Sequence, residues 1–113
     1  MTEQPEFAAR IAEEAAGTTE LLAGLHRDLA SLIVASADAN ADDEHDPEGA
    51  TIAFERAQLS ALIEQAETRL RELAVAERRL RDGDYGECER CGGQIGEQRL
   101  LARPATRRCV RCA

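Results

Sequence analysis

Apolar residues recur in a 4,3 rhythm along two long segments of this chain, and no other feature constrains the fold as strongly. The rhythm keeps one narrow stripe on one face of a helix, as in a coiled coil. In the first segment the stripe positions are Phe7, Ile11, Ala15, Thr18, Leu22, Leu25, Leu29 and Leu32. In the second segment they are Ile52, Leu59, Ile63, Ala66, Leu70, Leu73 and Leu80. We therefore predict a mainly α fold built on two long helices.

The residues between the stripes predict how the helices connect. Asp46 suits an N-cap, Pro47 the first helical position, and Gly83 a helix stop. A short linker between matched amphipathic helices favours an antiparallel hairpin over residues 7–83, after an N-terminal lead of residues 1–6. The predicted pairs are Leu32–Ile52, Leu25–Leu59, Thr18–Ala66 and Ile11–Leu73, with Arg56 on the seam near Leu29. A homodimeric coiled coil is the alternative, although we expect a monomer.

Four cysteines form two CxxC pairs, Cys88–Cys91 and Cys109–Cys112, in the last thirty residues. Two such pairs at this separation match the four-thiolate zinc pattern. With sulfur in all four positions no place is left for water, so we predict one structural Zn²⁺ in a module over residues 84–113 and no catalytic metal. Arg90, Arg107, Arg108 and Arg111 are expected to offset the negative charge of the thiolates. A pair of disulfides or a redox CxxC is the alternative interpretation.

The chain has a formal net charge of −8, and the charge is unevenly distributed. Residues 1–50 contain 12 Asp/Glu and 2 Arg, residues 51–83 contain 6 of each, and residues 84–113 contain 4 acids and 6 Arg, which gives −10, 0 and +2. An acidic chain is repelled by phosphate backbones, which argues against non-specific DNA or RNA binding. A basic protein surface is the more natural partner.

The N-terminal sequence MTEQPEFAAR lacks the charged start and apolar segment of a signal peptide. The longest apolar run, LASLIVASA, is far shorter than the roughly 20 residues that span a bilayer. We expect a soluble, cytoplasmic protein that does not associate with membranes. No nucleophile–base pair or phosphate-binding loop is recognisable, so we do not expect an enzyme.

The segment DANADDEHDPEGA, residues 38–50, contains six carboxylates between the two predicted helices. As the turn of a hairpin it would form the far tip. Its spacing imitates the start of an EF-hand, but position 6 is Asp43 and position 12 is Gly49, so calcium binding is disfavoured. Two interpretations remain open: a solvated loop that keeps the hairpin soluble, and an acidic tip that contacts a basic or metal-bearing partner.

The C-terminal stretch resembles the zinc-finger segment of the TraR/DksA family of transcription regulators, and the preceding hairpin is similar to the coiled coil of that family. The matching residues are Gly83, Tyr85, Gly86, Cys88, Cys91, Gly92, Ile95, Arg99, Leu100, Ala102, Pro104, Cys109 and Cys112. The resemblance implies a protein that binds RNA polymerase directly and does not bind DNA sequence-specifically. It implies that an acidic coiled-coil tip enters the secondary channel and alters the lifetime of promoter complexes.

Two features depart from the family pattern. The better-known tip reads Asp-x-x-Asp-x-Ala, but an alignment through Ala50 places His45 and Glu48 at the acidic positions; a looser match uses Asp43 and Asp46. We therefore take Asp43, Asp46, Glu48 and Ala50 as the candidate partner-binding residues. The sequence ends at Ala113, whereas many relatives continue into a C-terminal helix, so dependence on guanosine tetraphosphate is not carried over. The alternative functions are a nucleic-acid-binding zinc module and a coiled-coil adaptor with a partner other than polymerase.

Overall fold

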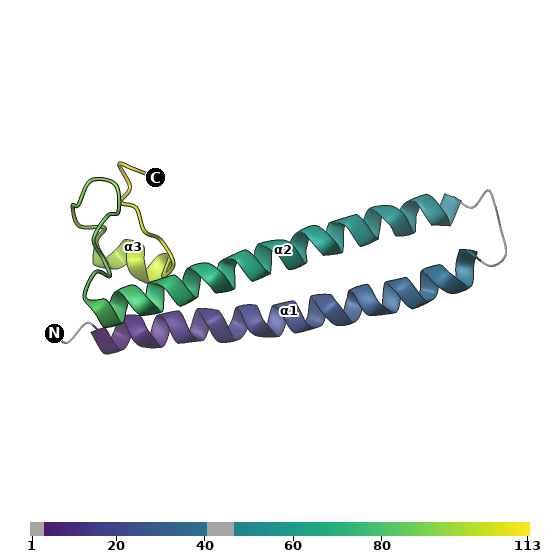
Figure 1. Ribbon diagram of the computed structural model, residues 1–113, viewed down its shortest axis with the longest axis horizontal. Coiled ribbons are helices and arrows are strands. Elements are labelled where there is room, and N and C mark those ends of the chain that lie inside the picture. The colour runs from purple at the N-terminus through teal and green to yellow at the C-terminus, as the bar shows by residue number, and fades with distance from the viewer. Residues whose placement is uncertain (1–3, 41–46) are drawn as a thin grey trace. The chain divides into compact units, whose positions relative to one another are not determined.

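The computed structural model describes residues 4–40 and 47–113 of the chain. Three helices follow one another along the sequence: α1 (Gln4–Asn40), α2 (Pro47–Asp82) and the short α3 (Glu97–Ala102) (Figure 1). In the described ranges there is no named strand, only an isolated antiparallel bridge between Glu87 and Gln94. The predicted mainly α fold with a small C-terminal cysteine module is confirmed.

The described chain forms two compact units, each containing a part of both long helices. Unit 1 combines Met1–Thr18 with Arg69–Ala113, and unit 2 is the continuous segment Thr19–Thr68. Within each unit, α1 and α2 run antiparallel to one another (Figure 1). None of the helices in the described ranges combines the length and the apolar character needed to cross a bilayer.

Unit 2 has a thin core between α1 and α2, formed by stripe residues of both helices. Leu25, Ile63 and Ala66 are its buried members. The half-buried residues packed against them are Leu22, Leu29 and Leu59. Leu25 and Leu59 therefore lie in one cluster, as the pairing predicts. Arg56, which was expected on the seam near Leu29, is exposed instead, and Leu59 of the next helical turn packs against the buried cluster.

Within unit 1, α1 and α2 also pack against each other, and the cysteine module belongs to the same unit. Ile11 of α1 packs with Leu73 and Ala76 of α2, in agreement with the predicted Ile11–Leu73 pair. The pairings of Leu32 with Ile52 and of Thr18 with Ala66 stay predictions.

The predicted segment boundaries differ from the elements and units of the structure. α1 begins at Gln4, so part of the expected lead over residues 1–6 is helical, with Pro5 and Glu6 in the first turn, where both are favoured. The boundary predicted after residue 83 falls inside unit 1. The reason is Phe7, which is buried in the same cluster as Ile95 and Leu100 of the cysteine module.

Candidate metal centre

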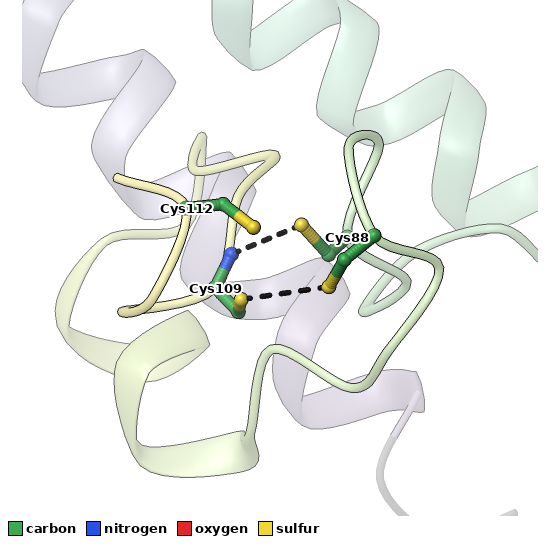
Figure 2. Close-up of side chains that lie close together, drawn as sticks. Cys88, Cys109 and Cys112 are labelled. Atoms are coloured by element: carbon green, nitrogen blue, oxygen red, sulfur yellow. Dashed lines mark hydrogen bonds between the residues drawn. The ribbon is translucent and has the colours of Figure 1, made fainter.

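The four cysteine sulfurs converge on one point in unit 1. All four Sγ atoms lie within 4.8 Å of one another, and those of Cys91 and Cys109 are 3.7 Å apart (Figure 2). A tetrahedral zinc ion with Zn–S bonds of about 2.3 Å separates its sulfur ligands by about 3.8 Å. The sulfurs are thus positioned for one tetrahedral ion, and a four-sulfur set of this kind fits a structural Zn²⁺.

The first cysteine pair is held by a tight turn that depends on glycine. Cys88 donates its backbone N–H to the carbonyl oxygen of Gly93 at 2.7 Å, and Gly92 donates to the carbonyl of Cys88 at 2.9 Å. Gly92 has φ 74°, a left-handed conformation that glycine adopts easily because it has no Cβ atom. The backbone N–H of Gly93 then points at Sγ of Cys91, 3.4 Å away. The turn therefore supplies a hydrogen-bond donor to a ligand sulfur as well as the correct chain reversal.

The second cysteine pair is tied to the first through its backbone. Cys112 donates its N–H to the carbonyl of Cys109 at 3.0 Å, which closes the second turn. The N–H of Cys109 donates to Sγ of Cys88 at 3.4 Å (Figure 2). Because amide donors favour a thiolate over a thiol, this bond stabilises the ligand form of Cys88.

The protonation of the cluster follows from these bonds. Backbone donation, first of all from Cys109, lowers the pKa of Cys88 to about 6. The pKa of Cys112 is raised to about 12, chiefly because its thiol is hydrogen-bonded to Cys109. Four thiols this close together share protons, and binding of a divalent ion requires those protons to leave. Metal affinity should accordingly rise with pH.

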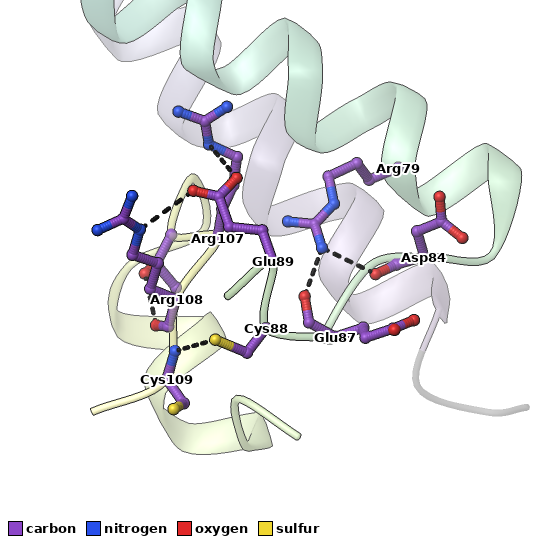
Figure 3. A network of polar contacts seen from close by, with 9 residues as sticks. Arg79, Asp84, Glu87, Cys88, Glu89, Arg107, Arg108 and Cys109 are labelled. Carbon is purple, nitrogen blue, oxygen red and sulfur yellow. Dashed lines mark hydrogen bonds and ion pairs between the residues drawn. The ribbon is translucent and has the colours of Figure 1, made fainter. Parts of the chain in front are cut away.

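Glu89 pairs with two arginines beside this centre, a role that its place inside the first CxxC motif does not reveal. Its carboxylate accepts from Nε of Arg108 at 3.1 Å and lies 3.8 Å from Nε of Arg107 (Figure 3). The hydrogen bond from Arg108 is the largest cause of a lowered Glu89 pKa. Arg107 and Arg108 are therefore paired with a carboxylate, whereas we expected them to offset the thiolates.

Arg79 joins the end of α2 to the start of the cysteine module. Its Nη2 donates to the carbonyl oxygens of Asp84, at 3.2 Å, and of Glu87 (Figure 3). The backbone N–H groups of Asp84 and Tyr85 in turn donate to the carbonyl of Arg79. These bonds fix the direction in which the chain leaves α2.

An aromatic pair packs the module onto α1, and one phenol bond closes the module on itself. The ring centroids of Phe7 and Tyr85 are 5.4 Å apart, and the angle between the ring planes is 58°. The Tyr85 hydroxyl donates a hydrogen bond to the carbonyl oxygen of Pro104 at 2.9 Å. Cys88 and Cys109 lie in the same cluster as Phe7. The sequence contains only three aromatic residues, and two of them are in contact here. Their scarcity is the feature of the sequence that could have pointed to this contact.

The predicted tip residues are only partly described. Asp43 and Asp46 lie outside the described residues, as does the side chain of Glu48, whereas Ala50 is exposed near the start of α2. The structure therefore brings the four cysteines together, while the role of the tip stays a prediction.

Comparison with known proteins places the chain beside a known family. Residues 83–113 match the family described as the prokaryotic dksA/traR C4-type zinc finger. An uncharacterized protein of Aquifex aeolicus (strain VF5) is 52% identical over 44 residues, which is 39% of this chain and 30% of that relative. The solved structure of transcription factor DksA2 from Pseudomonas aeruginosa superposes with a TM-score of 0.79 at 25% identity, covering 99% of this chain and 81% of that one.

Proposed function

Because the chain belongs to the DksA/TraR family, we propose that it is a transcription factor that binds RNA polymerase directly. The observation that carries this proposal is the combination of a family-specific four-cysteine finger with a fold similarity to DksA2 that extends over nearly the whole chain. In this role the protein regulates the polymerase and catalyses no reaction of its own.

The mode of action that we propose is entry of the acidic tip into the secondary channel of polymerase. Residues 19–68, which form unit 2, contain 11 Asp/Glu and 2 Arg, a net charge of −9. The other residues contain 11 Asp/Glu and 12 Arg, a net charge of +1, and the two values sum to −8. This segregation supports a probe directed at basic residues or at bound Mg²⁺, which takes carboxylate oxygens as ligands.

Within the tip we assign the contacts to Asp43, Asp46 and Glu48, and Ala50 marks the close approach of the helix start. Their carboxylates would change the lifetime of promoter complexes through electrostatic contacts. In the zinc centre, we assign the ligands to Cys88, Cys91, Cys109 and Cys112. Bound Zn²⁺ would hold the two cysteine turns together, and with them the packing of Phe7 on the module.

Photocrosslinking to purified polymerase tests this proposal. A photoreactive amino acid at position 43 should crosslink near the active centre, whereas the same group at Val110, which is 74% exposed on the cysteine module, should crosslink elsewhere. Binding with crosslinks from position 43 only to the outer surface would refute channel entry and leave polymerase binding intact. Failure to bind polymerase, together with tight and salt-sensitive binding to free nucleic acid, would refute the proposed function itself.

A further inference from the structure

We propose that a groove between α1 and α2 in unit 2 binds a cationic amphipathic helix of a partner protein. The groove has a volume of about 620 Å³. Four residues of α1 and four of α2 line it: Asp28, Ser31, Leu32, Ala35, Glu55, Gln58, Leu59 and Leu62. None of these residues belongs to the zinc centre or to the assigned tip, so the groove is a contact surface of unit 2 in addition to the contacts proposed above.

The groove exists because small side chains occupy one of its walls. On each helix the lining residues have the spacing i, i+3, i+4 and i+7, which places them on one face. Ser31 and Ala35 are too short to reach across that face to α2. The floor is left to Leu32 and Leu59, which are half-buried, and Leu62, which is 40% exposed.

Apolar exposure continues beyond the lining residues. Phe54 is 70% exposed and lies one helical turn before Gln58. Leu21 is 57% exposed and lies seven residues before Asp28, on the same side of α1. Both residues add exposed apolar surface to the helices that form the groove.

The charges beside the groove define what it accepts. Asp28 and Glu55 contribute one exposed carboxylate from each helix, and neither forms an ion pair with a side chain in the described ranges. The other feature is the apolar floor of Leu32, Leu59 and Leu62 between these carboxylates. An occupant with Lys or Arg flanking an apolar stripe complements both features, whereas the acidic unit 2 of a second copy would be repelled.

The shape of the groove selects a helix as the occupant. The lining residues of each wall extend over two helical turns, which matches the i, i+3/i+4, i+7 contacts of a helix laid in a groove. Addition of a strand requires an exposed sheet edge, and the described part of unit 2 consists of helices whose backbone groups are already paired.

Binding of a synthetic amphipathic peptide made of Leu and Lys to the full-length, zinc-loaded protein tests the inference. Fluorescence anisotropy of the labelled peptide gives the affinity, and ¹³C-methyl spectra give the location. We expect shifts at the methyl groups of Leu32, Leu59 and Leu62. An analogous peptide made of Leu and Glu should not bind.

Matched variants separate the groove from general attraction between charges. Asp28→Asn with Glu55→Gln should weaken peptide binding roughly fivefold, and Leu62→Ser roughly tenfold. Glu64→Gln with Glu67→Gln removes the same charge from exposed positions outside the groove lining, and Val34→Ser alters an exposed apolar residue outside it; both should change affinity less than twofold.

Equal losses in the groove and control variants, or methyl shifts without a preference for the groove residues, would overturn the inference. So would a concentration-dependent dimer in sedimentation that the peptide does not dissociate, since a second copy would then occupy the groove. Circular dichroism of each variant checks that its helices are intact.

Discussion

Arg10 of α1 donates a hydrogen bond from Nε to the carbonyl oxygen of Leu101 in α3, at 2.9 Å and across 91 residues of sequence. The same guanidinium donates from Nη2 to Glu14 at 3.0 Å, and the other oxygen of Glu14 lies 3.3 Å from Arg69 of α2. Burial alone would raise the pKa of Glu14, but the hydrogen bonds from Arg10 and Arg69 lower it below 4.5. One chain of contacts thus joins all three helices within unit 1.

Arg10→Ala should lower the free energy of unfolding by about 1.5 kcal/mol, because it leaves the Leu101 carbonyl without its donor and Glu14 without one partner. Urea denaturation at saturating Zn²⁺ measures the loss. Arg81→Ala is the matched control, since Arg81 pairs with Glu77 at 2.9 Å on an exposed surface and should cost less than about 0.5 kcal/mol. Equal effects of the two substitutions would show that the long-range bond contributes nothing.

Removal of zinc with a chelator should unfold the cysteine module, because structural zinc in small fingers contributes on the order of 10–16 kcal/mol of apparent binding free energy. The chain contains one Tyr and no Trp, so its tyrosine fluorescence comes from Tyr85 inside unit 1. We expect chelation to change this fluorescence and addition of Zn²⁺, but not Mg²⁺, to restore it. Unchanged fluorescence after complete removal of zinc would contradict a structural role for the metal.

High pH should destabilise unit 1 through Tyr85. Burial raises the pKa of Tyr85 from 10.0 to about 12, against a smaller opposing effect of Arg79 and Arg10. Because the folded state favours the protonated phenol, this stabilisation is complete below pH 10 and is lost as pH rises from 10 towards 12. Phenolate absorbance should titrate near 12 in the folded protein and near 10 in denaturant.

Tyr85→Phe serves as the companion variant for this titration. It removes the phenolate signal together with the hydrogen bond to Pro104, and should lower stability by about 1 kcal/mol at neutral pH. A phenolate titration near 10 in the folded wild-type protein would contradict the burial of Tyr85.

Substitution by Ala should change the free energy of unfolding in opposite directions at two glycines. Gly17 lies inside α1 with open space around it, so Gly17→Ala should stabilise the protein by about 0.5–1 kcal/mol. Gly92 also has open space but a φ of 74°, so Gly92→Ala should destabilise it by about 1 kcal/mol. Thermal unfolding of both variants measures the difference, and the same sign at both positions would exclude backbone conformation as the cause.

Glu48→Ala should alter the lifetime of promoter complexes about fivefold, as expected for loss of one carboxylate contact worth about 1 kcal/mol. Affinity for polymerase should change little, because most of the contact surface is retained. Glu64→Ala, at an exposed position of α2 outside the tip, is the control in the same transcription assay. Indistinguishable lifetimes for all three proteins would remove Glu48 from the proposed contact set.

The sequence was informative wherever a local rule decides the structure. The heptad spacing gives the face of each helix, and the short antiparallel connection gives the register, so Ile11 packs with Leu73 and Leu25 shares a cluster with Leu59. The four cysteines were equally predictable, since tetrahedral coordination requires them to meet. The starts and ends of α1 and α2 were expected within a few residues.

Contacts between residues far apart in the sequence could not be predicted in the same way. Phe7 reads as one more stripe residue, yet its partners lie in the cysteine module, and no periodicity encodes a contact of that range. The pairing of Glu89 with Arg107 and Arg108 was missed for a related reason: a list of charges does not reveal which of them are paired. The tip depends on residues 41–46, and its function rests on the partner that it meets.

Unit 1 is formed by two segments that are far apart in sequence, and this affects the order in which the protein folds during translation. Unit 2 is continuous in sequence, so its helices can pair soon after their synthesis. Phe7 and Arg10 at the start of α1 make contacts with residues 95–101 of the cysteine module. These contacts form only after the module has been translated and has bound metal. In zinc-starved cells the start of α1 in a new chain would therefore lack its contacts with the cysteine module. The exposed Phe7 would then be accessible to chaperones and proteases.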